Sequence, residues 1–286
     1  HCYLPLLCSP SLLRGAACIP SSLESKTLPF SRPFRRTSNG ARFPGLLMVD
    51  ALQTVEQSLR KVNDRVTELS AQHGRPPPRL VAVSKLQPNS AVAEAYAAGQ
   101  RCFGENYVQE IVGKAPELPG DIEWHFIGML QSNKAKTLVG GVPSLAVVES
   151  VHSAKTASAL QKACVAASRS TPLKVMIQVL TSGEESKSGC EPADCEAIAR
   201  HIRDQCPSLL LVGLMTIGKF GDPNPEPYFQ LLKECRTKVA KELDVQESSL
   251  ELSMGMSGDY DKAIAAGSTS VRVGTSIFGA RPPKGQ

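Results

Sequence analysis

The clearest pattern of hydrophobic positions lies between residues 52 and 69. Six hydrophobic residues recur there at spacings of three and four: Leu52, Val55, Leu59, Val62, Val66 and Leu69. This is the period of one face of an α-helix. Gly74 and the prolines at 76–78 follow, and both residue types end helices. The pattern predicts one amphipathic helix that ends before Gly74.

Beyond this helix, short hydrophobic runs alternate with helical patterns. The eight strand-like runs are Leu80–Val83, Arg101–Phe103, Trp124–Ile127, Leu145–Val148, Val175–Leu180, Leu209–Val212, Leu250–Leu252 and Ser270–Val273. Helical patterns over about 89–98, 153–168, 192–205 and 227–243 separate several of them. Such alternation indicates a parallel sheet. We therefore expect an α/β chain, a single (β/α)8 TIM-type barrel with an extra N-terminal helix. An open doubly wound sheet is the alternative.

Composition and charge narrow the possible partners. Of 286 residues, 42% are hydrophobic and 21% charged, which is typical of a folded chain. The net charge of +5 comes from the first 49 residues, because residues 50–286 hold 26 basic and 26 acidic side chains. A folded part without net charge gives no basic footprint for nucleic acid. No apolar run reaches the roughly 18 residues of a membrane span.

Residues 1–47 differ in composition from the rest. They contain six basic residues, seven serines and one acid, Glu24, a composition typical of organelle transit peptides. The chain starts with His1, and Met48 precedes the predicted helix, so these residues are alternatively non-native upstream sequence or a structured extension. We expect 1–47 to be disordered and 48–286 to form the barrel. The location is then the cytoplasm, or a plastid or mitochondrion if the leader is genuine.

Two common motif classes find no support. The segment Gly213–Lys219 is close to a phosphate-binding P-loop, but Phe220 stands where that motif needs Ser or Thr. The cysteines at 190, 195, 206 and 235 form no pair with two residues between them, so we expect no metal site.

Lys85 ends the hydrophobic run Leu80–Ser84. In a barrel, the carboxyl ends of the strands form the active face. A desolvated lysine there loses its proton more easily, and its neutral amine can form a Schiff base with a carbonyl. A lysine that merely extends to solvent from a strand end is the plainer alternative.

Glycine-rich segments follow the last two predicted strands. They are Leu252–Asp259, with Ser257, and Val271–Thr275. In barrels, the loops after strands 7 and 8 frequently bind a phosphate, helped by a helix N-terminus, although glycines also mark ordinary turns. A reactive lysine opposite a phosphate site indicates a phosphorylated aldehyde: pyridoxal 5'-phosphate (PLP), or the substrate of a lysine-type aldolase.

Several segments together resemble the pyridoxal phosphate homeostasis proteins. They are Val81–Lys85, Phe103–Glu110, Trp124–Gly128, Leu130–Lys134, Gly183–Gly189, Gly213–Ile217, Leu252–Ser257, Gly267–Thr275 and Ile277–Gly279. The resemblance covers about residues 50–281. It implies a barrel similar to the N-terminal domain of alanine racemase. It also implies a role in cellular PLP homeostasis without established catalytic turnover.

The resemblance assigns roles to individual residues. Lys85 would hold PLP as an internal aldimine, and Ser257, Gly274 and Thr275 would bind its phosphate. Arg272 matches the arginine that faces the pyridine nitrogen in similar racemases, where it disfavours protonation of that nitrogen. Asn106 and His125 would lie near the ring face. Leu180 replaces an asparagine common in the family, which puts one polar contact in doubt.

Three hypotheses remain open. The first is a non-enzymatic, monomeric PLP carrier whose partners are the cofactor and apo-enzymes that use it. The second is a PLP-dependent racemase, which needs a second acid–base group that racemases take from an additional domain. The third is a lysine-type aldolase without a bound chromophore. The first hypothesis accounts for the lysine, the phosphate site and the resemblance together.

Overall fold

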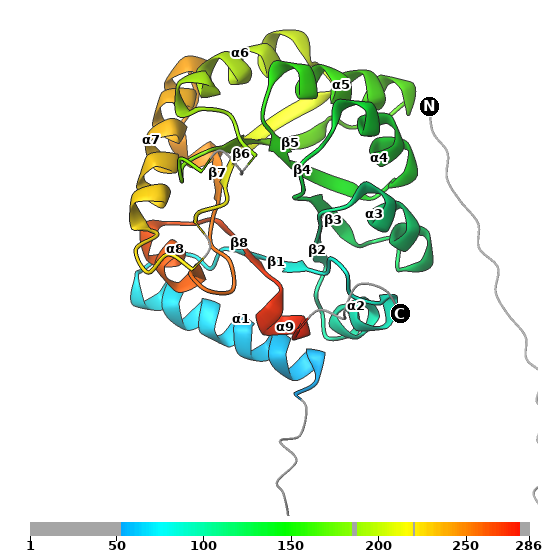
Figure 1. Cartoon of the computed structure of the whole chain (residues 1–286), viewed down its shortest axis with the longest axis vertical. Coiled ribbons are helices and arrows are strands. Elements are labelled where there is room, and N and C mark those ends of the chain that lie inside the picture. Colours follow the sequence, from blue (N-terminus) through cyan, green and yellow to red (C-terminus); the bar gives the residue numbers. More distant parts are fainter. Residues whose placement is uncertain (1–52, 185–187, 220, 281–286) are drawn as a thin grey trace, which may run out of the picture. The chain divides into compact units, whose positions relative to one another are not determined.

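Eight parallel strands form a closed barrel in the computed structural model, which describes residues 53–184, 188–219 and 221–280. Each strand pairs with its neighbours in sequence, and β8 closes the ring against β1 (Figure 1). The strands are β1 Arg79–Val83, β2 Cys102–Glu105, β3 Glu123–Phe126, β4 Leu145–Val151, β5 Leu173–Val179, β6 Leu209–Thr216, β7 Glu251–Ser253 and β8 Ser270–Val273. The predicted barrel is confirmed.

Helices surround this barrel (Figure 1). They are α1 Val55–Gln72, α2 Asn89–Ala97, α3 Val108–Lys114, α4 Ala135–Gly141, α5 Ala154–Ala166, α6 Cys195–Gln205, α7 Glu226–Leu243, α8 Tyr260–Ala266 and α9 Thr275–Phe278. Four short 3-10 helices supplement them: η1 Ala115–Glu117, η2 Ser132–Lys134, η3 Pro192–Asp194 and η4 Glu247–Ser249. No helix of the described residues is long and apolar enough to cross a membrane.

The extra N-terminal helix is α1, as predicted. Thr54 caps it: its hydroxyl accepts from the Gln57 backbone N–H, while the Gln57 side chain accepts from the Thr54 N–H. This reciprocal pair satisfies two backbone donors that a helix start leaves unpaired. The buried face includes Leu59, Val62 and Val66, and the helix packs against α8 and α9. The predicted leader, 1–47, lies outside the described residues.

The main hydrophobic core lies between the barrel wall and the helices. Val81 and Ala82 of β1 are both fully buried, as expected for a strand of a parallel sheet covered on both faces. A second, smaller cluster consists of Val147, Met176 and Met215 from β4, β5 and β6. Polar side chains from β3, β4, β7 and β8 are buried near it, so part of the protein interior is charged and hydrogen-bonded.

Candidate functional site

One cavity of about 290 Å³ lies at the carboxyl ends of the strands. Six of the seven residues that the sequence analysis places near the cofactor line it: Lys85, Asn106, Ser257, Arg272, Gly274 and Thr275. They come from segments around β1, β2, β7 and β8. β8 closes the barrel against β1. The pairing of the first and last strands therefore brings Lys85 close to the predicted phosphate loops. Leu180 is not among the lining residues.

The backbone on both sides of Lys85 is held by a buried network of charges. Glu105 Oε1 accepts from the Ser84 hydroxyl at 2.7 Å. Lys114 Nζ donates to the Ser84 carbonyl at 2.7 Å. On the other side, the Leu86 N–H donates to Glu110 Oε1 at 2.6 Å. Lys85 itself is half-buried, so its neighbours are fixed while its own side chain reaches the cavity.

Lys114 joins the two acids of this network. Its Nζ lies 2.7 Å from Glu105 Oε1 and 2.6 Å from Glu110 Oε1. Burial raises the pKa of Glu105, and the Lys114 ammonium opposes that rise. The network also supports a strained turn, because Leu86 has φ of 62°, which is unfavourable for a residue with a branched side chain.

The sequence alone did not reveal this network. Glu110 and Lys114 stand four residues apart on α3, the spacing of an ion pair along a helix. That spacing is a weak signal, since such pairs are common on exposed surfaces. Only the packing of α3 beneath the β1 end, where Lys114 is 6% exposed, turns the pair into a support for Lys85.

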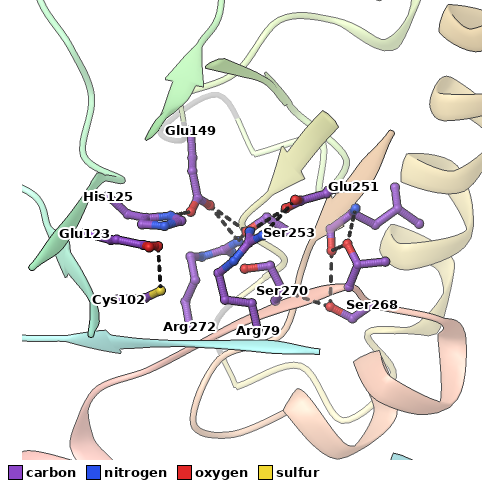
Figure 2. Close-up of polar contacts among 12 residues, drawn as sticks. Arg79, Cys102, Glu123, His125, Glu149, Glu251, Ser253, Ser268, Ser270 and Arg272 are labelled. Atoms are coloured by element: carbon purple, nitrogen blue, oxygen red, sulfur yellow. Dashed lines mark hydrogen bonds and ion pairs between the residues drawn. The ribbon is translucent and has the colours of Figure 1, made fainter. Parts of the chain in front are cut away.

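Arg272 lies on β8 at the floor of the cavity and is 4% exposed. Its Nη2 donates to the Thr216 carbonyl at 2.6 Å, and its Nη1 donates to Ser253 Oγ. Nη1 is also 3.7 Å from Glu149 Oε2 (Figure 2). Burial lowers the pKa of Arg272, while the Glu149 carboxylate favours its charged form. The guanidinium is therefore held in place by neighbours on three strands.

His125 is placed differently from our expectation. It lies on β3, is 1% exposed, and its Nδ1 is 2.6 Å from Glu149 Oε1 (Figure 2). It does not line the cavity. Glu149 Oε2 also accepts from the Ser253 hydroxyl at 2.6 Å. His125 is therefore linked to Arg272 through Glu149.

Several hydrogen bonds join the predicted phosphate loops, and one of them involves Ser257. The Gly274 N–H donates to Ser257 Oγ at 3.2 Å, so the loop after β7 and the loop after β8 lie against each other. Gly255 has φ of 98°, and a Cβ there would lie 2.6 Å from the Ala263 Cβ. Only glycine fits this close approach. Because α9, which begins at Thr275, has one turn only, a phosphate in this place would meet hydroxyl and loop backbone donors and not the start of a long helix.

Asn106 supplies an unsatisfied polar atom. Among the described residues, its Oδ1 is one of the buried side-chain atoms without a hydrogen-bond partner. Gly128 fixes the Asn106 backbone from below, since a Cβ at 128 would lie 2.0 Å from the Asn106 carbonyl oxygen. A buried acceptor without a partner is costly, so a ligand that donates to it, directly or through water, would be stabilised.

Charged side chains that the sequence did not suggest also line the cavity, among them Lys219 and Asp259. Lys219 is exposed and provides a second amine for comparison with Lys85. Burial raises the pKa of Asp259, opposed by a hydrogen bond from the Met256 N–H, whose nitrogen is 2.6 Å from Asp259 Oδ1. This carboxylate shapes the loop that carries Ser257.

The residues present fit a phosphorylated aldehyde. An amine, a buried arginine and a cluster of hydroxyl and glycine positions lie around one cavity. The orphaned Asn106 oxygen adds a polar contact at the wall. The cavity is at the small end of the usual range for ligand sites, about 300–1,000 Å³, which suits a single-ring compound.

Three comparisons bear on this site and fold. Residues 57–282 match the family described as "Alanine racemase, N-terminal domain". The chain is 47% identical over 236 residues to the pyridoxal phosphate homeostasis protein of Homo sapiens, covering 78% of this chain and 86% of that protein. It is similar in structure to PipY of Synechococcus elongatus with PLP bound, at a TM-score of 0.64 and 35% identity, covering 79% of this chain and 100% of PipY.

More distant structures share the fold alone. Alanine racemase from Corynebacterium glutamicum superimposes at a TM-score of 0.58 with 14% identity, over 80% of this chain and 63% of the racemase. At that identity, similarity of architecture does not extend to activity.

Proposed function

Because this chain belongs to the pyridoxal phosphate homeostasis proteins, within the alanine racemase N-terminal domain family, we propose that it binds PLP and takes part in homeostasis of that cofactor. The observation that carries the proposal is the cavity at the carboxyl ends of the strands, where Lys85 and Arg272 lie with the loops after β7 and β8. The solved PipY structure with PLP supports the choice of ligand.

Lys85 holds the cofactor covalently in this proposal. The neutral Nζ attacks the aldehyde carbon, a C=N bond forms and one water molecule leaves. The fixed backbone on both sides of Lys85 favours this step, because the amine is presented to one place at little entropic cost. Ser257, Gly274 and Thr275 bind the phosphate, and Asn106 contacts the ring or its hydroxyl.

The proposal does not include catalytic turnover. Arg272 at the pyridine nitrogen would disfavour protonation there, and an unprotonated ring withdraws electrons less well. A change of pH in the ordinary range would not remove the charge of Arg272, because arginine stays protonated there and the Glu149 carboxylate favours the charged form. The protein would release or exchange PLP with apo-enzymes, acting as a monomer.

Absorption spectroscopy of the purified protein tests the proposal. Titration of the cofactor-free chain with PLP should produce a yellow chromophore that borohydride removes. Lys85→Ala should abolish the reducible adduct yet keep weak binding, since charge-assisted contacts to the phosphate remain. Lys219→Ala is the matched control, because Lys219 lines the same cavity, and it should retain the adduct. An adduct in Lys85→Ala would contradict the assignment.

Deuterium exchange at Cα of alanine and other amino acids separates carrier from racemase. We expect far slower exchange than with a true racemase measured alongside, because a positioned acid–base group contributes about 10²- to 10⁴-fold. Exchange within about tenfold of the racemase would favour a PLP-dependent enzyme. If PLP did not bind but a sugar phosphate did, the lysine-type aldolase would be favoured.

A further inference from the structure

A second cluster of ligand-type side chains lies at the opposite end of the barrel, where β2 and β3 begin. Cys102 is the first residue of β2 and Glu123 the first of β3, and the two are paired in register. His125 follows two residues after Glu123, so its side chain leaves β3 on the same face. One ligand atom from each of the three lies within 4.8 Å of the other two.

We propose that Cys102, Glu123 and His125 bind a divalent cation of the zinc type. Sulfur, imidazole nitrogen and carboxylate oxygen are the ligands that Zn²⁺ takes in proteins, and three protein ligands with one open position is a common arrangement. Two paired strands hold the ligands, so the site is built on rigid backbone. A thiolate and a carboxylate would balance the charge of the cation.

The surroundings of His125 support this site independently. Its Nδ1 lies 2.6 Å from Glu149 Oε1, and both side chains are at most 1% exposed (Figure 2). Metal-binding histidines commonly donate one ring N–H to a carboxylate, which leaves the other nitrogen as the basic ligand atom. With Nδ1 held by Glu149, Nε2 is the nitrogen available to a cation.

The contact between Cys102 and Glu123 marks the place of the cation. The Cys102 Sγ donates to Glu123 Oε2 at 3.3 Å, so one proton now lies between two ligand atoms. A bound cation would take the place of this proton. The positively charged side chain of Arg79 lies at the same end of the barrel. Both of its Nη atoms donate to the Glu251 carboxylate, at 2.6 and 2.8 Å, so Glu251 balances its charge.

The spacing in the sequence could not reveal this cluster. Cys102 and Glu123 are 21 residues apart, and no motif with short ligand spacing joins them. Strand pairing brings them together. The site lies at the end of the barrel opposite the cavity, and His125 is linked to Arg272 of the cavity through Glu149.

Titration of the full, reduced chain with Co²⁺ tests the site. Cobalt bound by a thiolate in a tetrahedral site gives a near-ultraviolet charge-transfer band and intense visible bands. We expect the unmodified chain to bind one Co²⁺ at this site with a charge-transfer band. Cys102→Ser should lose the intensity of that band. Cys206→Ser, which removes a buried cysteine outside the cluster, should keep the full intensity. Excess Zn²⁺ should bleach the bands.

Glu123→Gln provides a variant with little risk to folding, because Glu123 is exposed. It should weaken Co²⁺ binding at this site by about tenfold or more, since even outer contacts of a metal site contribute about 10- to 100-fold. Absence of bands in the unmodified chain would overturn the proposal. So would equal charge-transfer intensity in the unmodified chain and Cys102→Ser, or unchanged affinity in Glu123→Gln.

Discussion

The two ends of the barrel use charge in different ways. At the carboxyl ends of the strands, Glu105 and Lys114 are almost fully buried and fix the backbone beside Lys85. At the opposite end, Arg79 and Glu251 form a bidentate pair whose side chains remain 34% and 28% exposed. The first pair is buried against Ser84, next to Lys85, and the second joins β1 to β7.

The difference in burial shows where the fold contains an ion pair that is energetically costly to bury. Burying an ion pair takes both charges out of water, and the pair often adds no net stability compared with apolar residues. Partly exposed pairs cost less and contribute less. Finding the buried charges beside the candidate lysine therefore favours a positioning role for them.

Lys114→Met should have the largest effect on stability. It leaves the Glu105 carboxylate buried without its cation, and loss of one partner from a buried pair typically costs about 3–5 kcal/mol. Urea denaturation measures the free energy of unfolding. Lys136→Met, at an exposed position of α4, is the control and should stay within about 0.5 kcal/mol. Equal effects of the two substitutions would remove the distinction between buried and exposed charge.

Glu149→Gln should destabilise the protein in a pH-dependent way. Burial alone would raise the pKa of Glu149, but hydrogen bonding and charge from His125, and then Arg272, bring it below its ordinary value. A depressed carboxyl pKa stabilises the fold above the ordinary value of about 4.3, and this stabilisation is lost as the pH falls through the folded-state pKa.

Unfolding of the unmodified chain and Glu149→Gln should therefore be compared at several pH values. We expect the free energy of unfolding of the two proteins to differ by roughly 2–4 kcal/mol at pH 7, and this difference should become smaller below about pH 4. A difference that stays constant over this range would mean that the Glu149 charge is not what His125 and Arg272 stabilise.

Ser257→Ala should weaken PLP binding without preventing the adduct on Lys85. A hydrogen bond to a charged phosphate contributes about 1.5–3 kcal/mol, which corresponds to about tenfold or more in Kd. Equilibrium titration with PLP measures the change. Ser249→Ala, an exposed serine in η4, should bind as the unmodified chain does. Unchanged affinity in Ser257→Ala would exclude Ser257 from the phosphate contacts.

Glu251→Gln should have the smallest effect. Partly exposed ion pairs contribute about 0–1 kcal/mol, so the free energy of unfolding should change by no more than that amount. PLP binding should be unaffected, because the Arg79–Glu251 pair does not line the cavity. A change in PLP affinity here would show that the two ends of the barrel are energetically coupled.

The sequence predicted the barrel because its signals are local and repeated. Each strand such as Leu80–Val83 is a short hydrophobic run, and helices such as 227–243 span several turns. The helices α3, α4, α8 and α9 were not predicted, since seven residues or fewer give too few turns for a clear period. Lys85 was found because parallel strands place their carboxyl ends together, whereas Arg272 was assigned from the resemblance to the family.

Side-chain partnerships across the barrel were not predictable in the same way. His125 was expected near the ring, and the structure instead places it against Glu149. Both residues are buried and lie on strands. The sequence of one strand does not determine which side chain of another strand its polar side chain will contact. The Glu105–Lys114 network depends likewise on how α3 packs under β1.

Peptide mapping after borohydride reduction tests the central claim most directly. The chain is saturated with PLP, reduced, digested and analysed by mass spectrometry for lysines that carry the reduced cofactor. The account predicts one dominant modified peptide, that of Lys85, with Lys219 unmodified although it lines the same cavity. Modification chiefly at Lys219, or spread over exposed lysines in proportion to their accessibility, would contradict it.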